Sequence, residues 1–122
     1  AFSERFTIVR EGTGGLSDVT VSQRLVDITL VDNGMEIDGD TVDLYLNGSP
    51  VVTNHVLAGG AGTSFGLMLQ SGGNVLEVYA VNEGSVSPNT ALLAISNVTG
   101  GLAQQEWRLR AGEWGSLTIT AP

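Results

Sequence analysis

Apolar and polar residues alternate along most of this sequence, and this period of two constrains the fold more than any other feature. Between residues 24 and 31, for example, Val26, Ile28 and Leu30 fall on one side of an extended chain. Alternation of this kind indicates β-strands with one buried face, and patterning with the period of a helix is nearly absent. The segments that show it span residues 24–31, 41–46, 63–70, 74–81, 91–96, 105–110 and 116–120.

Glycine and asparagine separate these segments. Asn47-Gly48 is a dipeptide that tolerates positive φ at both central positions of a type I′ turn, so it predicts a β-hairpin. Further glycine clusters lie at 59–62, 71–74 and 100–101, and a chain of 122 residues has room for one core. We therefore expect an all-β fold: an antiparallel β-sandwich, immunoglobulin-like or jelly-roll-like, with about 8–10 strands.

The first 22 residues differ from the rest. A strand is expected here, with Phe2, Phe6 and Ile8 on one face, followed by a flexible glycine-rich joint at 12–15. We therefore divide the chain into an N-terminal extended strand with its joint, residues 1–22, and a sandwich domain, residues 23–122. An apolar strand on such a tether can pair with its own sheet or act as a donor strand for a neighbouring copy, and the sequence leaves both open.

The charge balance excludes several classes of partner. Carboxylates number 13 against five basic residues, and the formal net charge is −8. Such a surface repels phosphate backbones and anionic lipid, so we expect no nucleic-acid binding and no membrane insertion. There is no cysteine for a disulfide or a thiolate metal site, and no apolar run approaches the roughly 18 residues of a membrane helix. The composition, with Ala1 as first residue, favours an extracellular, cell-surface or virion-surface protein.

The densest group of acidic residues lies between two expected strands. Calcium takes about six to eight oxygen ligands from a bendable loop. The spacing is not that of an EF-hand, and Asp and Asn residues that form polar turns explain the group at least as well. If an ion is bound, we expect calcium, with Glu83 contributing if its loop lies at the same end of the sandwich. The candidate metal ligands are Asp32, Glu36, Asp38, Asp40 and Glu83.

No catalytic constellation is visible in the sequence. His55 is the single histidine, it falls in an apolar segment where a structural role is expected, and no Ser-His-Asp or phosphate-loop pattern surrounds it. We therefore expect a protein that is not an enzyme and has no cofactor other than calcium. Four aromatic residues, some of which are expected to face away from the core, would offer a platform for a glycan, although packing on the sheet explains them as well. They are Tyr45, Tyr79, Trp107 and Trp114.

Paired motifs recur between about Leu25 and Ile119. The first pair is Asp32-Asn33-Gly34 with Asp38-Gly39-Asp40, and the second is Asn82-Glu83-Gly84 with Pro88-Asn89-Thr90-Ala91. With these motifs the chain resembles an immunoglobulin-like β-sandwich domain of secreted bacterial proteins and of structural proteins of marine bacteriophages. The resemblance implies a non-catalytic accessory or structural role and transfers no catalytic residue. The N-terminal strand lies outside it.

Two functions are compatible with these features. The first, which we favour, is a non-enzymatic structural subunit of an extracellular filament, sheath or virion exterior. Its partners are copies of itself, joined as a homo-oligomer or polymer through the strand that carries Phe2, Phe6 and Ile8. The second is a calcium-stabilised module that binds carbohydrate or protein.

Overall fold

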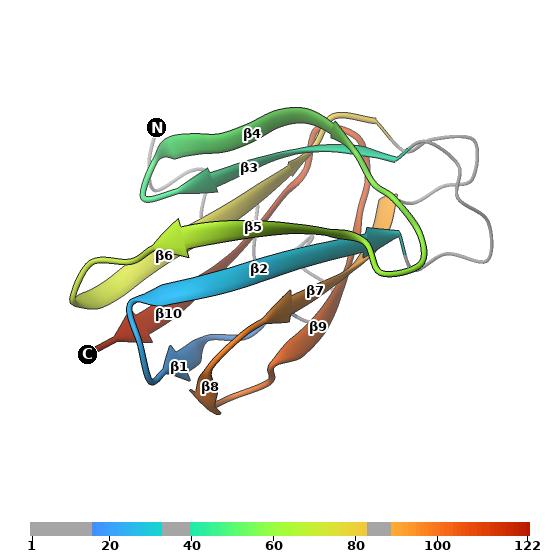
Figure 1. Ribbon diagram of the computed structural model, residues 1–122. Coiled ribbons are helices and arrows are strands. Elements are labelled where there is room, and N and C mark those ends of the chain that lie inside the picture. Colours follow the sequence, from blue (N-terminus) through green and yellow to red (C-terminus); the bar gives the residue numbers. More distant parts are fainter. Residues whose placement is uncertain (1–15, 33–39, 83–88) are drawn as a thin grey trace.

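The computed structural model describes residues 16–32, 40–82 and 89–122 (Figure 1). This part of the chain consists of strands and the turns that join them. The strands are β1 (Val19–Val21), β2 (Leu25–Asp32), β3 (Thr41–Leu46), β4 (Ser49–Val56), β5 (Thr63–Met68), β6 (Gly72–Ala80), β7 (Asn89–Ile95), β8 (Val98–Gly100), β9 (Gln104–Leu109) and β10 (Trp114–Ala121).

The strands form two sheets that pack face to face (Figure 1). Sheet A has the order β4-β3-β6-β10-β1-β8, and sheet B has the order β5-β2-β7-β9. Among these strands all pairs are antiparallel except β1 with β10, where Val19 lies opposite Ile119. From β4 onward, successive strands alternate between the two sheets, so most connections cross from one layer to the other. The predicted all-β sandwich is therefore confirmed.

The hairpin predicted at Asn47-Gly48 joins β3 to β4. The two residues have positive φ values of 51° and 84°, as a type I′ turn requires, and Leu46 lies opposite Ser49 across the turn. Asn47 also fixes the hairpin to β6. It donates its main-chain N–H to the carbonyl oxygen of Val75 and accepts the N–H of Val75 on Oδ1, each at 2.8 Å.

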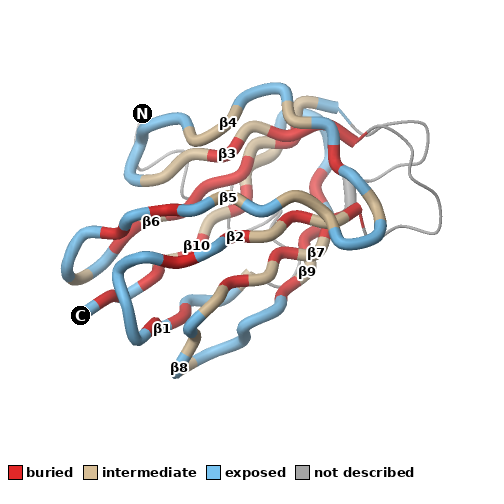
Figure 2. Tube along the Cα trace, in the orientation of Figure 1, coloured by how far each residue is buried: buried red, intermediate tan, exposed pale blue. Residues whose placement is uncertain are grey.

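The core lies between the sheets and is built from the residues that alternate inward, coloured red in Figure 2. Val26, Ile28 and Leu30 are fully buried, as the alternation predicts. Trp107 of β9 is also inside the core, with 1% of its surface exposed. Residues two apart in a strand point the same way, so Trp107 shares the inward face with Leu109. The expectation that Trp107 contributes to a glycan platform is therefore wrong.

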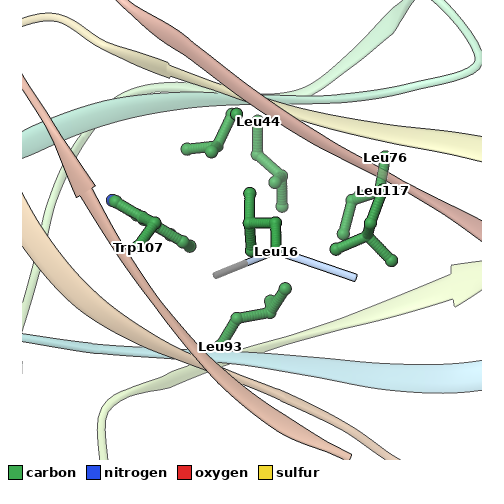
Figure 3. A pocket seen from close by; sticks show the side chains of 8 residues that line it. Leu16, Leu44, Leu76, Leu93, Trp107 and Leu117 are labelled. Carbon is green, nitrogen blue, oxygen red and sulfur yellow. The ribbon is translucent and has the colours of Figure 1, made fainter. Parts of the chain in front are cut away.

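The described chain enters the sandwich at Leu16, just before β1. The Leu16 side chain points into a small apolar void between the sheets (Figure 3). A Cβ built on Gly115 would lie 2.6 Å from Leu16 Cδ1, so the absence of a side chain at position 115 makes the room for Leu16. The other residues that line the void are Leu44, Leu76, Val78, Leu93, Trp107 and Leu117.

Polar contacts fasten the next two residues. The buried side-chain amide of Gln105 in β9 accepts the N–H of Ser17 on Oε1 and donates from Nε2 to the Ser17 carbonyl oxygen at 2.8 Å. Asp18 Oδ1 accepts the N–H of Thr118 in β10, also at 2.8 Å. We call residues 16–18 the anchor. The sequence pattern grouped them with the N-terminal segment, residues 1–22, and in the structure they lie against β9 and β10.

A buried amide connects several turns to the core. Asn74 of β6 has no exposed surface. Its Nδ2 donates to the carbonyl oxygens of Gln70, Gly72 and Ile119 at 2.9, 3.0 and 3.1 Å. Its Oδ1 accepts the N–H of Gln70 at 2.9 Å and the side-chain N–H of Asn47 at 3.0 Å. Asn74 therefore holds the chain that follows β5, the β3–β4 hairpin and β10 in fixed relation.

Candidate functional site

The two residues that flank the predicted calcium loop are both buried. Asp32 closes β2 with 6% of its surface exposed, and Asp40, just before β3, has 2% exposed. Their backbones bond adjacent residues of one connection. Asp32 donates its N–H to the carbonyl oxygen of Ala58, and the carbonyl oxygen of Asp40 accepts the N–H of Leu57, each at 2.8 Å. The connection after β4 thus brings the two aspartates to one end of the sandwich.

The residue that precedes the second acidic connection lies at the same end. Asn82 follows β6, its Oδ1 accepts the N–H of Thr41 at 2.9 Å, and its Nδ2 donates to Thr41 Oγ1 at 3.2 Å. Asp32 lies opposite Ala91 of β7, the strand that follows that connection. The strands that flank the acidic connections, residues 33–39 and 83–88, therefore meet at one end of the sandwich, which we call the acidic end. This is the arrangement that the calcium prediction needs.

The other candidates lie outside the described residues: Glu36, Asp38 and Glu83 as metal ligands, and Phe2, Phe6 and Ile8 on the predicted donor strand. Within residues 16–32, 40–82 and 89–122, no group of three or more His, Cys, Asp or Glu side chains is placed to hold a metal ion. The calcium site and the donor strand both stay predictions.

Three of the four candidate aromatic residues gather on the outer face of sheet A. Tyr45, Tyr79 and Trp114 occupy outward positions on β3, β6 and β10, and each is partly exposed. The ring centroid of Trp114 lies 4.8 Å from that of Tyr79 and 5.5 Å from that of Tyr45, with interplanar angles of 48° and 42°. These spacings are those of rings packed on one another. We call this cluster the aromatic face.

Beneath the aromatic face lies a carboxylate that was not among the candidates predicted from the sequence. Glu77 lies on the outer side of β6, opposite Tyr45 and Ser116, yet only 2% of its surface is exposed. Tyr45 and Trp114 stand on the strands either side of β6, whose backbones are about 9–10 Å apart. Their centroid distance of 5.5 Å therefore means that the two rings lean toward each other over β6. The alternation along β6 already places Glu77 on this outer face.

His55 closes the open side of the sandwich between β4 and β5. Its ring meets Phe65 edge-on, with a centroid distance of 5.3 Å and an interplanar angle of 84°. Burial lowers the pKa of His55, and the buried Nε2 has no hydrogen-bond partner among the described residues. The neutral imidazole therefore packs as an apolar ring at the edge of the sandwich.

The outer edges of the two sheets differ in how well they could pair with another chain. Natural sheets discourage such pairing with proline, bulges, short strands and charges. β4 contains Pro50, its pairing with β3 shifts register twice, and Asn54 has a positive φ of 53°. β8 has three residues. β9 carries an exposed ion pair between Arg108 Nε and Glu106 Oε2 at 3.0 Å. These three edge strands are poor templates for a further strand.

Among the strands that the structure describes, the remaining edge strand, β5, has none of these features. Its six residues include no charge and no proline, and its pairing with β2 runs without a register shift. Leu69 donates its N–H to the carbonyl oxygen of Arg24 at 2.8 Å, which places the odd-numbered residues of β5 in the hydrogen-bonded pairs with β2. The main-chain N–H and C=O groups of Ser64, Gly66 and Met68 therefore point away from β2, toward the open edge.

Comparison of this sequence with known protein families, with curated proteins and with solved structures gives no match. The resemblance to sandwich domains of secreted bacterial proteins and phages therefore stays a prediction. In the part of the chain that the structure describes, no helix has the length and apolar character needed to cross a membrane.

Proposed function

We propose that this chain is a non-enzymatic structural subunit of an extracellular assembly, and that its copies join by addition of a β-strand. The observation that carries the proposal is the β5 edge. A regular strand of six residues, whose outward N–H and C=O groups lie on Ser64, Gly66 and Met68, is a template for another strand. Because β4, β8 and β9 are protected, β5 is the described edge that best supports the addition of a strand.

The single histidine supports a role without catalysis. A general base needs its free nitrogen within reach of a substrate proton. The Nε2 of His55 is buried, and its ring packs against Phe65. This environment suits a packing group at the edge of the sandwich better than a group that transfers protons.

The size of the native particle tests the proposal. We expect light scattering and negative-stain microscopy of the full chain to show regular polymers or rings. The same measurement in calcium and then in chelator would show whether the acidic end takes part in assembly. A monomer in both conditions would exclude a self-assembling subunit.

The aromatic face favours a second candidate function, a carbohydrate-binding module. The partly exposed rings of Tyr45, Tyr79 and Trp114 present broad apolar surface with a polar edge. We expect such a module to be retained on polysaccharide columns and to lose retention in Trp114→Ala. Leu102→Ala, at a residue 57% exposed outside the aromatic face, is the matched control. Passage of the wild-type chain through every column would remove this candidate.

Both candidates accommodate calcium at the acidic end, where Asp32 and Asp40 lie together. An ion that binds only the folded chain raises the free energy of unfolding, by about 2.7 kcal/mol at a concentration 100 times its Kd. Calcium should therefore raise the unfolding temperature, and Asp38→Asn should reduce the rise. Asp27→Asn, on the exposed outer side of β2, should leave the rise unchanged. An unfolding midpoint that ignores excess calcium would exclude the site.

A further inference from the structure

We infer, resting on the proposed function, that the strand added at the β5 edge is the N-terminal segment, residues 1–15, of a neighbouring copy. The donor, the acceptor and the direction of growth then follow from the positions of the anchor and the β5 edge on the sandwich.

The anchor and the acceptor strand lie at opposite edges of sheet B. Ser17 is held by the Gln105 side chain of β9, and β9 is the edge strand farthest from β5 (Figure 1). Three strand spacings separate β5 from β9, which is about 14 Å along the sheet. The described chain therefore enters the domain on the side away from its own β5 edge.

The length of the joint favours pairing between copies over pairing within one copy. With the predicted strand running to Glu11, residues 12–15 connect it to Leu16, and the five Cα–Cα steps from Glu11 to Leu16 span at most about 18 Å. A strand paired with β5 would lie one spacing beyond it, which is four strand spacings or about 19 Å from β9. A route from the anchor to the β5 edge of the same copy must pass around the sandwich, which is longer than the straight separation. A neighbouring copy beside the anchor presents its β5 edge without that detour.

The acceptor edge also offers apolar surface. Val51 and Val52 of β4 and Phe65 of β5 are partly buried and pack against the core from the open side of the sandwich. Figure 2 shows this side mostly in the colours of exposed and intermediate residues. A strand added at β5 with Phe6 and Ile8 pointing inward would cover these side chains. Their burial would add to the affinity that the main-chain hydrogen bonds supply.

Opposite placement of donor and acceptor makes the contact heterologous, because each copy gives with one surface and receives with another. Contacts of this kind either close into a ring or extend as an open filament. They do not produce a two-fold symmetric dimer.

Two sets of variants separate the acceptor from the donor. Gly66→Pro removes an outward N–H from the β5 edge and keeps the bonds to β2, since residue 66 does not bond β2. Gly66→Ala is its control, because it keeps the N–H and its Cβ would meet nothing closer than Asp27 Oδ1 at 3.8 Å. On the donor, Phe6→Asp combined with Ile8→Asp places charges on the apolar face. Thr7→Asp places a charge on the opposite face.

We expect the wild-type chain, Gly66→Ala and Thr7→Asp to polymerise, and both Gly66→Pro and the Phe6/Ile8 double variant to stay monomeric. Mixed in equal amounts, the two monomeric proteins supply one intact donor and one intact acceptor. Sedimentation velocity of the mixture should then show a heterodimer of twice the 12.7 kDa chain mass and no polymer. Urea unfolding of each variant alone checks that its sandwich is folded.

The outcomes that oppose the inference are distinct from those that oppose the proposed function. If the wild-type chain is itself monomeric, the proposed assembly fails. If Gly66→Pro polymerises as the wild type does, assembly stands and β5 is not the acceptor. If the folded variants do not form a heterodimer when mixed, the donor of one copy does not pair with the β5 edge of another, and the inference is wrong.

Discussion

The substitution Asn74→Asp tests how the sandwich holds the end of its β5 edge. It preserves the shape of the side chain and replaces an NH2 group by an oxygen. In the native structure this nitrogen donates to three carbonyl oxygens, those of Gln70, Gly72 and Ile119, at 2.9–3.1 Å. At neutral pH the variant would bring a carboxylate oxygen against the same three acceptors without a proton to share.

The magnitude of the effect follows from these contacts. A buried polar group left without its partner costs about 1–3 kcal/mol, and an uncompensated buried charge costs about 3–5 kcal/mol. We therefore expect Asn74→Asp to lower the free energy of unfolding by about 3–5 kcal/mol near neutral pH. The free energy of unfolding of a domain is typically about 5–15 kcal/mol, so this loss is a large fraction of the total.

The loss should shrink in acid. Burial and the facing carbonyl oxygens raise the pKa of the new carboxyl above its unfolded value of about 3.9. Below that value both the folded and the unfolded chain carry the proton. As pH rises through it, the unfolded chain releases its proton first, so the stability of the variant falls with rising pH.

Urea unfolding, followed by the fluorescence of the buried Trp107, measures the difference from wild type at each pH. Asn74→Leu is the control, because it removes the same hydrogen bonds without adding a charge, so its loss should not depend on the ionisation of residue 74. A loss below about 1 kcal/mol for Asn74→Asp, or one that grows in acid, would show that Asn74 does not make these bonds.

Further substitutions test other features. Gly115→Ala should cost about 1–3 kcal/mol because its Cβ would crowd Leu16 Cδ1 at 2.6 Å. The cost should fall in a Leu16→Ala background, and strict additivity in the double-mutant cycle would contradict the packing. Because burial lowers the pKa of His55, the wild type should lose stability as pH falls below the unfolded value of about 6.5. His55→Gln should lack this loss. If the urea midpoints of the two proteins fall equally with decreasing pH, His55 is not the cause. Gly62 and Gly60 both have positive φ, 74° and 64°, but a Cβ would meet the backbone of β2 only at Gly62. Gly62→Ala should therefore lower Tm much more than Gly60→Ala. Equal losses would mean that backbone strain, and not the contact with β2, causes the effect.

The sequence predicts strands well where alternation runs for six or more residues between turn signals. β2, β3, β5 and β6 lie within about two residues of their predicted bounds, because burial of one face is a local pattern. β1 and β8 were not predicted. Each has three residues, too few to show a period, and their pairing with one another and with β10 depends on residues distant in the chain.

The candidate surfaces divide in the same way. The outward positions of Tyr45, Glu77 and Tyr79 follow from alternation alone. The meeting of Tyr45 with Trp114 does not, because β3 and β10 become near neighbours only through β6. The expectation for Trp107 failed because it shares a face with the buried residue two positions away. The open β5 edge lay beyond sequence reasoning, since periodicity does not fix the order of strands in a sheet.

The anchor has consequences for the order of events during synthesis. Gln105 lies 88 positions after Ser17, and Thr118 lies 100 positions after Asp18. A chain that emerges in sequence order from a ribosome or a secretion channel therefore has no partner for its anchor until β9 and β10 have emerged and folded back. The anchor is therefore among the last parts of the chain that folding fixes in place. If copies join as proposed, a nascent chain would acquire the geometry for joining only when its domain is complete, and unfinished copies would be kept out of the assembly.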